Sequence, residues 1–265
     1  MELEQLMNPE KTRKLLSAER ESLICRTLTA GVKTISELSD ELHVSEATVR
    51  RDLETLEQQG VIRRVYGGAE LLRKRHTEPL YEEKASLHAP EKSRIAEAAV
   101  KFVQEGDTIF LDGGSTVLEM ARRLPSLRDL TVVTNSLMAA AELMEKNFHL
   151  ILVGGEFRSL SRTLVGPLTA KVLGSLTVSK AFLGTIGLEA ERGISTTDPN
   201  EAYTKELVMK RADKVYLLAD SSKFGVSSFV FSGSASDIDV LITDGGLSAA
   251  AVKQLKSQNM EVILT

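Results

Sequence analysis

The chain has 265 residues, of which 42% are hydrophobic and 26% are charged, and these proportions are typical of a folded globular protein. No apolar stretch approaches the roughly 20 residues needed to span a bilayer, and the first residues are acidic without an apolar leader, so we expect a cytoplasmic protein with no membrane partner. Cys25 is the single cysteine, which excludes an intramolecular disulfide and a cysteine-based zinc cluster.

Charge is distributed unevenly along the chain. The formal net charge is −4, but residues 1–75 carry 13 basic and 13 acidic side chains, whereas residues 76–265 carry 20 basic and 24 acidic ones. Binding to nucleic acid depends on where cations lie relative to phosphates, so an acidic total does not exclude it. The modest basicity of the first part favours a homo-oligomer, a dimer or tetramer, that engages several sites at once.

Residues 1–18 are predicted to form a polar N-terminal extension, and residues 19–72 a small domain that begins with helices. Apolar residues recur at helical spacing in Glu19–Leu28 and again in Ile35–Leu42. Ser45 suits the N-cap of a third helix, whose apolar residues also fall on one face.

Two short strand-like segments follow the third helix. They are Val61–Val65 and Ala69–Leu72, and they flank Tyr66-Gly67-Gly68, where glycine permits the positive φ of a hairpin tip. Three helices followed by a basic hairpin indicate a winged helix-turn-helix.

In a helix-turn-helix, the N-terminal residues of the second helix of the motif contact base edges, and arginine is suited to guanine and to phosphate. We interpret Asp52 as a residue that orients one of the neighbouring arginines. Predicted contacts with double-stranded operator DNA are Ser45, Glu46, Ala47, Thr48, Arg50, Arg51, Arg63, Arg64 and Gly67. The helices alone would also fit a protein-interaction module with solvated arginines.

Residues 73–90 are charged and lack strand periodicity, so we interpret them as a partly helical linker before a domain at 91–265. In that domain apolar runs alternate with helical segments, which predicts an α/β fold with a parallel sheet. The predicted strands are Thr108–Leu111, Thr131–Thr134, Leu150–Val153, Ala181–Gly184, Val215–Ala219, Val240–Thr243 and Val262–Leu264.

Glycine-rich and polar loops follow these strands, and a parallel sheet gathers such loops at the carboxyl ends of its strands. Gly113-Gly114 precedes a helix whose N-terminus favours an anion, although the same turn also fits a connection with no ligand. Carboxylates would bind hydroxyls, and lysines would supply positive charge. Predicted effector-binding residues are Asp112, Gly113, Gly114, Ser115, Thr116, Thr134, Asn135, Ser136, Arg158, Glu201, Lys205 and Lys223. The pattern implies a small phosphorylated sugar or polyol.

The run from Val44 to Glu57, followed by Arg64-Val-Tyr-Gly-Gly-Ala69, resembles the winged N-terminal domain of DeoR-family bacterial regulators. One departure is His43, where many members carry a small residue, and we interpret it as structural because histidine tolerates left-handed geometry.

The later loops resemble the family's sensor domain, which is similar in fold to ribose-5-phosphate isomerases and coenzyme A transferases. The positions that match the sensor pattern are Asp112, Gly114, Ser115, Thr116, Asn135, Arg158, Glu201, Lys205 and Lys223. The resemblance implies a DNA-binding regulator, usually a repressor of a carbohydrate catabolic operon, that responds to a phosphorylated sugar or related metabolite.

The rival class is an enzyme, a sugar-phosphate isomerase-like domain fused to a DNA-binding domain. Isomerisation needs a base beside the reacting carbons, and isomerases of this fold carry an acidic cluster where this chain has Thr185 and Ile186. Ile186 also replaces an Asp that is frequent among the family's sensors. No Ser-His-Asp set or metal-ligand spacing is visible, so we expect no catalytic residue, no metal and no cofactor besides the effector.

Overall fold

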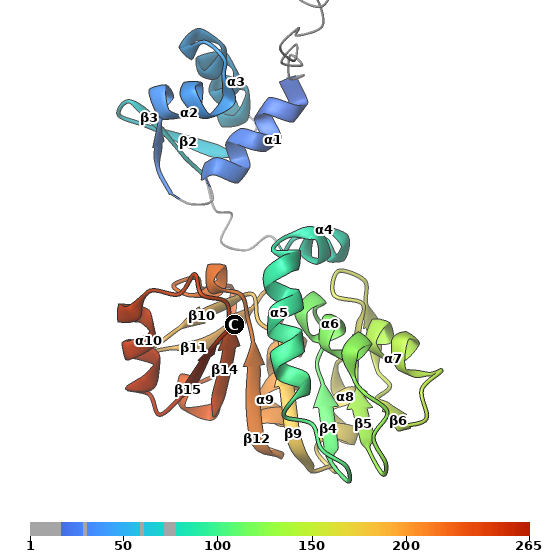
Figure 1. Cartoon of the computed structure of the whole chain (residues 1–265). Helices are drawn as coiled ribbons and strands as arrows, with labels where there is room; N and C mark the ends of the chain where they lie inside the picture. Colours follow the sequence, from blue (N-terminus) through green and yellow to red (C-terminus); the bar gives the residue numbers. More distant parts are fainter. Residues whose placement is uncertain (1–16, 29–30, 59–60, 72–77) are drawn as a thin grey trace, which may run out of the picture. The chain divides into compact units, whose positions relative to one another are not determined.

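The computed structural model describes residues 17–28, 31–58, 61–71 and 78–265, and it divides the chain into unit 1, Met1–Lys74, and unit 2, Arg75–Thr265 (Figure 1). Most of the predicted N-terminal extension lies outside the described residues. So do residues 72–77, which are the last residue of the predicted small domain and the beginning of the predicted linker. Each unit is described by itself below. Among the described residues, none of the helices is both long and apolar enough to cross a membrane.

Unit 1 is a winged helix-turn-helix, as the sequence predicts. Its strands form an antiparallel sheet in the order β1-β3-β2, and its three helices enclose a core centred on Ile24, Leu38, Val49 and Leu53. The elements are α1 (Ser17–Leu28), β1 (Lys33–Thr34), α2 (Ile35–Leu42), α3 (Glu46–Gln58), β2 (Ile62–Val65) and β3 (Gly68–Leu71).

Local chemistry sets both ends of α2. Thr34 and Glu37 form a reciprocal capping box at its start, where the Glu37 amide donates to Thr34 Oγ1 at 3.2 Å and the Thr34 amide to Glu37 Oε2 at 2.7 Å. His43 ends the helix with a left-handed φ of +51°, which agrees with its predicted structural role. The turn therefore delivers the chain directly to the start of α3.

Glycine is required at the wing for two reasons. Gly67 has a φ of +79° at the hairpin tip, and its carbonyl accepts a hydrogen bond from the Ile35 amide at 3.0 Å. A Cβ at Gly68 would lie 2.1 Å from the Lys33 carbonyl oxygen, because β1 and β3 pair closely there. The wing is thus fastened to the beginning of α2.

Unit 2 is an α/β layered structure around one large sheet. Its helices are α4 (Tyr81–Ser86), α5 (Ala89–Val100), α6 (Ser115–Arg123), α7 (Leu137–Leu143), α8 (Pro167–Leu173), α9 (Pro199–Met209) and α10 (Ala249–Lys256), with short 3-10 turns η1 (Ser221–Lys223) and η2 (Ala235–Asp237). The large sheet contains β4 (Thr108–Leu111), β5 (Thr131–Thr134), β6 (His149–Leu152), β9 (Val178–Leu183), β12 (Ala212–Leu218), β14 (Val240–Thr243) and β15 (Glu261–Leu264).

These seven strands are the seven that the sequence predicts, with ends that differ by at most three residues. All neighbouring pairs in the sheet are parallel, so the predicted α/β fold is confirmed. Smaller antiparallel sheets lie beside it: β7 (Glu156–Arg158) pairs with β8 (Thr163–Val165), and β11 (Gly193–Thr196) lies between β10 (Gly187–Glu189) and β13 (Val230–Gly233).

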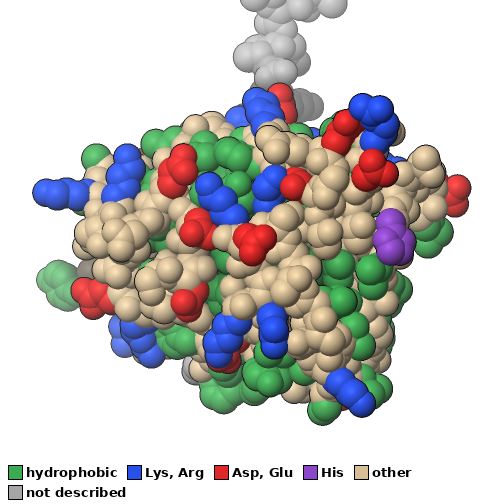
Figure 2. All heavy atoms as spheres, turned by 90° about the horizontal axis from the view of Figure 1, so that it is seen from below, with side chains coloured by type: hydrophobic (Ala, Val, Ile, Leu, Met, Phe, Trp, Pro, Cys, Tyr) green, Lys and Arg blue, Asp and Glu red, His purple; other side chains and the backbone are tan. Residues whose placement is uncertain are grey.

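Helices cover both faces of the large sheet (Figure 1). Alternate residues of β4 point to opposite faces, so Ile109 and Leu111 pack in the core beneath α5, α6 and α7, whereas Phe110 packs in the core with α8, α9 and α10. In the face seen in Figure 2, acidic and basic side chains are interspersed around hydrophobic patches. Both faces of the sheet being covered explains why its strands read as nearly continuous apolar runs.

The strand order reverses between β4 and β9. From β4 the chain proceeds through β5 to β6 at one edge, then returns to β9 and proceeds through β12 and β14 to β15 at the other. Such a switch point separates the loops that follow the two central strands and leaves a crevice at their carboxyl ends. The fold therefore predicts that a ligand binds beside Asp112 and Gly184, which follow β4 and β9 directly.

The predicted linker contains α4 and the beginning of α5, so it is helical in part. The two helices are separated by His88, which has a left-handed φ of +55°. Lys92 on α5 is buried, and its Nζ donates to the Lys84 carbonyl oxygen and, at 2.6 Å, to that of Leu87. Burial lowers the pKa of Lys92 to about 8. Lys92 thus holds the end of α4 against α5 through main-chain acceptors.

The low pKa of Lys92 predicts a pH dependence of stability. Between about pH 8 and the ordinary value of 10.5 the unfolded chain keeps a proton that the folded chain has lost, so stability rises with pH in that window. Relative to Lys92→Met, the wild-type free energy of unfolding of unit 2 should increase by up to about 3 kcal/mol across it. Urea unfolding at several pH values measures this difference. Lys101→Met, which removes an exposed lysine just after the same helix, is the control, and parallel pH profiles for wild type and Lys92→Met would contradict the assignment.

Candidate functional site

Two regions contain the residues that the sequence singles out. The first is the outer face of α3 together with the wing of unit 1. Val49, Leu53 and Leu56 are buried, and the predicted contacts Glu46, Ala47, Arg50 and Arg51 are exposed on the same helix. Ser45 stands before the helix, where its Oγ accepts a hydrogen bond from the Thr48 amide at 3.3 Å. The face that α3 leaves uncovered is the one that a helix-turn-helix presents to a major groove.

The arginines of this face differ in their surroundings. Arg50 pairs with Glu46 one turn earlier at 3.0 Å, whereas the Arg51 side chain has no ion pair among the described residues. On the wing, Arg63 Nε donates to Glu70 Oε1 at 2.6 Å, and Arg64 lies 3.7 Å from Glu54 of α3. Exposed pairs of this kind contribute little to stability and exchange partners easily, so these arginines are available to phosphates and bases.

The expectation that Asp52 orients Arg50 or Arg51 is wrong. Asp52 is buried on the inner side of α3, where Arg20 of α1 donates to its two carboxylate oxygens at 2.8 and 2.9 Å. A bidentate pair of this geometry fixes α1 against α3. Asp52 therefore supports the packing of unit 1 and does not belong to the DNA-facing surface.

Sequence reasoning omitted Tyr66 from the predicted contacts. Its ring is fully exposed beside Gly67 at the tip of the wing. The signal in the sequence is its place between Arg64 and Gly67, and an aromatic ring with a hydroxyl can both pack and form a hydrogen bond.

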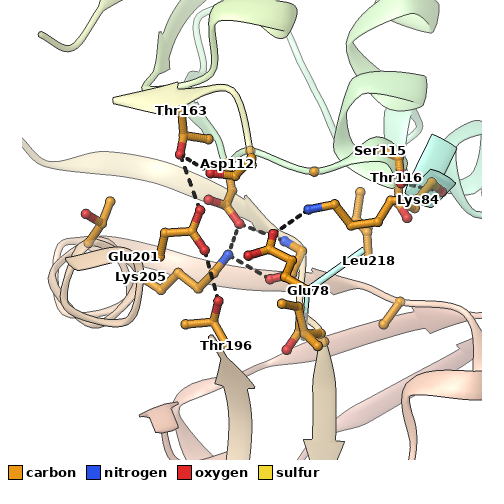
Figure 3. A pocket seen from close by; sticks show the side chains of 18 of the residues that line it. Glu78, Lys84, Asp112, Ser115, Thr116, Thr163, Thr196, Glu201, Lys205 and Leu218 are labelled. Atoms are coloured by element: carbon orange, nitrogen blue, oxygen red, sulfur yellow. Dashed lines mark hydrogen bonds and ion pairs between the residues drawn. The ribbon is translucent and has the colours of Figure 1, made fainter. Parts of the chain in front are cut away.

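The second region is a pocket in unit 2 at the carboxyl ends of β4, β5, β9 and β12 (Figure 3). It lies at the switch point of the sheet, and loops from the β7–β8 hairpin, from β11 and from α9 complete its wall. Of the twelve predicted effector-binding residues, those that line it are Asp112, Gly113, Gly114, Ser115, Thr116, Asn135, Glu201 and Lys205. The structure thus brings together loops that are up to 93 positions apart in the chain.

Asp112 and Lys205 form a buried ion pair across the switch point. Lys205 Nζ of α9 contacts Asp112 Oδ2 and donates to the Gly184 carbonyl oxygen at 2.9 Å, and the Gly184 amide donates to Asp112 Oδ2 at 3.0 Å. We expected Lys205 to supply free positive charge and Asp112 to bind hydroxyls. Both are already engaged with one another, so their first effect is to join α9 to the ends of β4 and β9.

Glu201 is held in the same way by its neighbours. Its carboxylate accepts from Thr196 Oγ1 at 2.9 Å, from Thr163 Oγ1 at 3.3 Å and from Arg158 at 3.3 Å. Arg158 lies behind Glu201 and does not line the pocket itself. It also pairs with Asp198 at 3.4 Å.

The beginning of α6 provides unfilled hydrogen-bonding capacity. Gly114 takes the N-cap position with a φ of +128°, and no side chain caps the helix. The first amides of a helix have no partner within it, so this end attracts an anion. Nearby, Asn135 Nδ2 donates to the Leu164 carbonyl oxygen at 3.0 Å, while its Oδ1 is buried without a hydrogen-bond partner. An incoming donor would satisfy that oxygen.

Four predicted residues do not line the pocket. Thr134 is buried and donates to the Leu111 carbonyl oxygen at 2.7 Å, and Ser136 caps α7 by accepting from the Ala139 amide at 3.2 Å. Lys223 lies 4.0 Å from Asp220, and Arg158 acts through Glu201 as described. In this structure these side chains hold the loops in shape, and Arg158 does so through the pocket carboxylates Glu201 and Glu78.

Glu78 and Lys84 also line the pocket, and they were not predicted because they belong to the segment interpreted as a linker. The Glu78 side chain is only 2% exposed and accepts from Arg158 at 2.6 Å, from Lys84 at 2.5 Å and from Thr197 at 2.6 Å. Burial alone would raise the pKa of Glu78, but the hydrogen bonds from Arg158 and Lys84 outweigh it and lower the pKa. Figure 3 shows Glu78 and Lys84 meeting in the middle of the site. A single glutamate before a proline gave no recognisable signal in the sequence.

A winged helix-turn-helix followed by a parallel-sheet unit with a polar pocket defines a DNA-binding regulator with a sensor domain. Comparison with family models agrees: residues 21–75 match the DeoR-like helix-turn-helix domain, and residues 87–245 match the DeoR C terminal sensor domain. The chain belongs to the DeoR family of transcriptional regulators.

Two relatives illustrate this membership. The chain is 38% identical over 250 residues to the HTH-type transcriptional regulator GlpR of Haloferax volcanii, covering 94% of this chain and 98% of that protein. It is 38% identical over 218 residues to the lactose phosphotransferase system repressor of Streptococcus mutans, covering 81% and 86%. Both are named as regulators, and the family decides against the enzyme interpretation.

Among solved structures, ribose 5-phosphate isomerase A from Methanocaldococcus jannaschii is similar to part of this chain. The match covers 50% of this chain and 53% of the isomerase chain, with 22% sequence identity and a TM-score of 0.38.

The pairing of Lys205 with Asp112 predicts that Lys205→Met destabilises unit 2. Removing the lysine leaves a buried carboxylate without its cation, which costs about 3 kcal/mol. Lys210→Met at the end of the same helix is the matched control, because Lys210 forms an exposed pair with Glu206, and such pairs contribute little to stability. Urea unfolding measures both, and equal small losses would show that the buried pair is not structural.

Proposed function

We propose that this chain is a repressor of a carbohydrate catabolic operon, and that a small phosphorylated sugar or related metabolite bound in the pocket of unit 2 weakens its hold on operator DNA. Double-stranded operator DNA would be bound by α3 and the wing. This target implies action in the cytoplasm.

One observation carries the effector part of the proposal. The pocket combines an uncapped helix N-terminus at Gly114–Thr116 with an unpaired acceptor on Asn135 and with hydroxyl-bearing walls. The helix end suits a phosphate, and the polar walls suit sugar hydroxyls. The name of the Streptococcus mutans relative, a lactose phosphotransferase system repressor, supports the choice of sugar metabolism.

A homo-oligomer, a dimer or tetramer, is part of the proposal. Residues 1–75, which contain unit 1, carry 13 basic and 13 acidic side chains, so a single copy would neutralise few phosphates. Two reading helices set one helical turn of DNA apart would multiply that weak affinity.

The DNA-reading face predicts the effect of replacing Arg50 and Arg51 together with Ala. Each arginine that contacts a base is worth about 1–3 kcal/mol, so the promoter fragment upstream of the protein's own operon should be bound at least about tenfold more weakly. A gel shift at low salt measures this. Arg128→Ala removes an exposed arginine of unit 2 and should change nothing. Unchanged retention by the double variant would remove α3 from the DNA interface.

The pocket predicts which ligands stabilise the protein. Thermal-shift screening against pentose and hexose phosphates should identify a compound that raises the melting temperature, because ligand binding to the folded state stabilises it by mass action. Thr116→Val removes one pocket hydroxyl and should weaken that ligand by about five- to tenfold, as expected for one hydrogen bond. Thr131→Val, at the opposite end of β5, is the control. A stabilising ligand that ignores Thr116→Val would lie in another site.

A further inference from the structure

Glu78 differs from the other carboxylates of the pocket in where it comes from. Asp112 follows β4 and Glu201 belongs to α9, both inside the sheet-and-helix framework of unit 2. Glu78 precedes α4, and in the sequence it stands four positions after Lys74, where unit 1 ends. A pocket side chain is therefore supplied by the part of the chain that connects the reading unit to the sensor.

The donors around Glu78 are those that a phosphate would use. Arg158 and Lys84 place two cations on its carboxylate, and the Thr197 hydroxyl adds a third hydrogen bond. Arginine and lysine with hydroxyl donors are a common phosphate-binding set, and a carboxylate held by them occupies the same positions as two phosphate oxygens. Glu78 is thus an internal anion in an anion site.

The charges of the site oppose a second anion while Glu78 is present. Its cations are Lys84, Arg158 and Lys205. Its carboxylates are Glu78, Asp112, Asp198 and Glu201, which exceed the cations by one. Removal of Glu78 makes the set neutral. A phosphate entering this low-dielectric site would meet net repulsion before that removal and much less after it.

The available space leads to the same conclusion. The cavity measures about 70 Å³. The Glu78 carboxylate and the Lys84 ammonium line this cavity, so they take up part of the space in which a ligand would lie. Figure 3 shows the Glu78 carboxylate beside Lys84 in the middle of the site, and withdrawal of Glu78 would open space next to Lys84.

We propose that Glu78 is a built-in competitor of the effector: the effector's phosphate replaces the Glu78 carboxylate on Arg158 and Lys84 and so frees Glu78–Leu80, the beginning of the segment that precedes α5, while Lys84 stays in place. This inference rests on the proposed function, and it adds how the pocket communicates with unit 1. The segment has two states, docked with Glu78 in the pocket or released with phosphate there. An effector that binds only the released state shifts the population toward it. The docked state is the one that holds operator DNA.

Inorganic phosphate is the probe that tests this competition, with the full-length chain and isothermal titration calorimetry. Glu78→Gln keeps the shape and removes the charge, so phosphate should bind at least about tenfold more tightly than to wild type, a change of about 1.4 kcal/mol. Glu82→Gln is the matched control: it makes the same charge change in the same segment, but Glu82 pairs with Arg162 and does not line the pocket. It should behave like wild type.

DNA binding provides the second measurement. Without any ligand, Glu78→Gln should retain the operator fragment about tenfold less well than wild type or Glu82→Gln, because the docked state has lost its anchor. Addition of phosphate should then have little further effect on Glu78→Gln.

The outcomes separate the two ideas. Equal phosphate affinities of wild type and Glu78→Gln, both weakened by Thr116→Val, would overturn the competition and leave the pocket as an anion site. No phosphate binding to either protein would overturn the anion pocket and the competition together.

Hydrogen exchange of wild type gives a test that needs no variant. Saturating phosphate should increase exchange of the amides of Glu78 and Leu80, and unchanged or decreased exchange there would contradict their release.

Discussion

The ion pair between Asp112 and Lys205 is the interaction on which the sensor unit depends. It lies where the strand order reverses, and it ties a helix from late in the chain to the ends of the two central strands. Because Gly184 donates to the same carboxylate oxygen and accepts from the same lysine, two strand ends and one helix converge on one buried point. The pair keeps these segments together, and the pocket lies beside it. The ligand contacts that we propose are therefore next to a fixed point of the structure.

Unit 1 obtains its rigidity by different means. Its α2–α3 turn depends on a capping box and a left-handed histidine. Its wing depends on Gly67, which has a positive φ at the hairpin tip, and on Gly68, which lets β3 approach β1. Arg20 and Asp52 then lock α1 to the inner side of α3. The exposed arginines of α3 and the wing contribute little to the stability of unit 1. A small domain with its polar anchoring on the inside can therefore change its outer residues, and so its DNA sequence preference, without changing its fold.

Much of this architecture could be predicted from the sequence, and the failures share a cause. Buried parallel strands are apolar throughout, so all seven were recognised from composition. Polar residues after those strands were also recognisable, but the sequence does not distinguish Ser136, which caps a helix, from Asn135, whose oxygen is left unpaired. Asp52 was assigned the wrong role because its partner Arg20 is 32 positions away. Glu78 was not recognised because its partner Arg158 is 80 positions away. Long-range ion pairs leave no periodic trace.

The unpaired side-chain oxygen of Asn135 sets a condition on any molecule that enters beside it. A guest that offers a hydroxyl there replaces nothing and gains a hydrogen bond, whereas a deoxy analogue of the same size leaves a polar atom sealed from water. Selectivity at such a point arises because the deoxy analogue cannot donate the hydrogen bond. This selectivity can exceed the selectivity of a close steric fit. The amide of Asn135 would thus let the pocket distinguish two ligands that differ by a single oxygen.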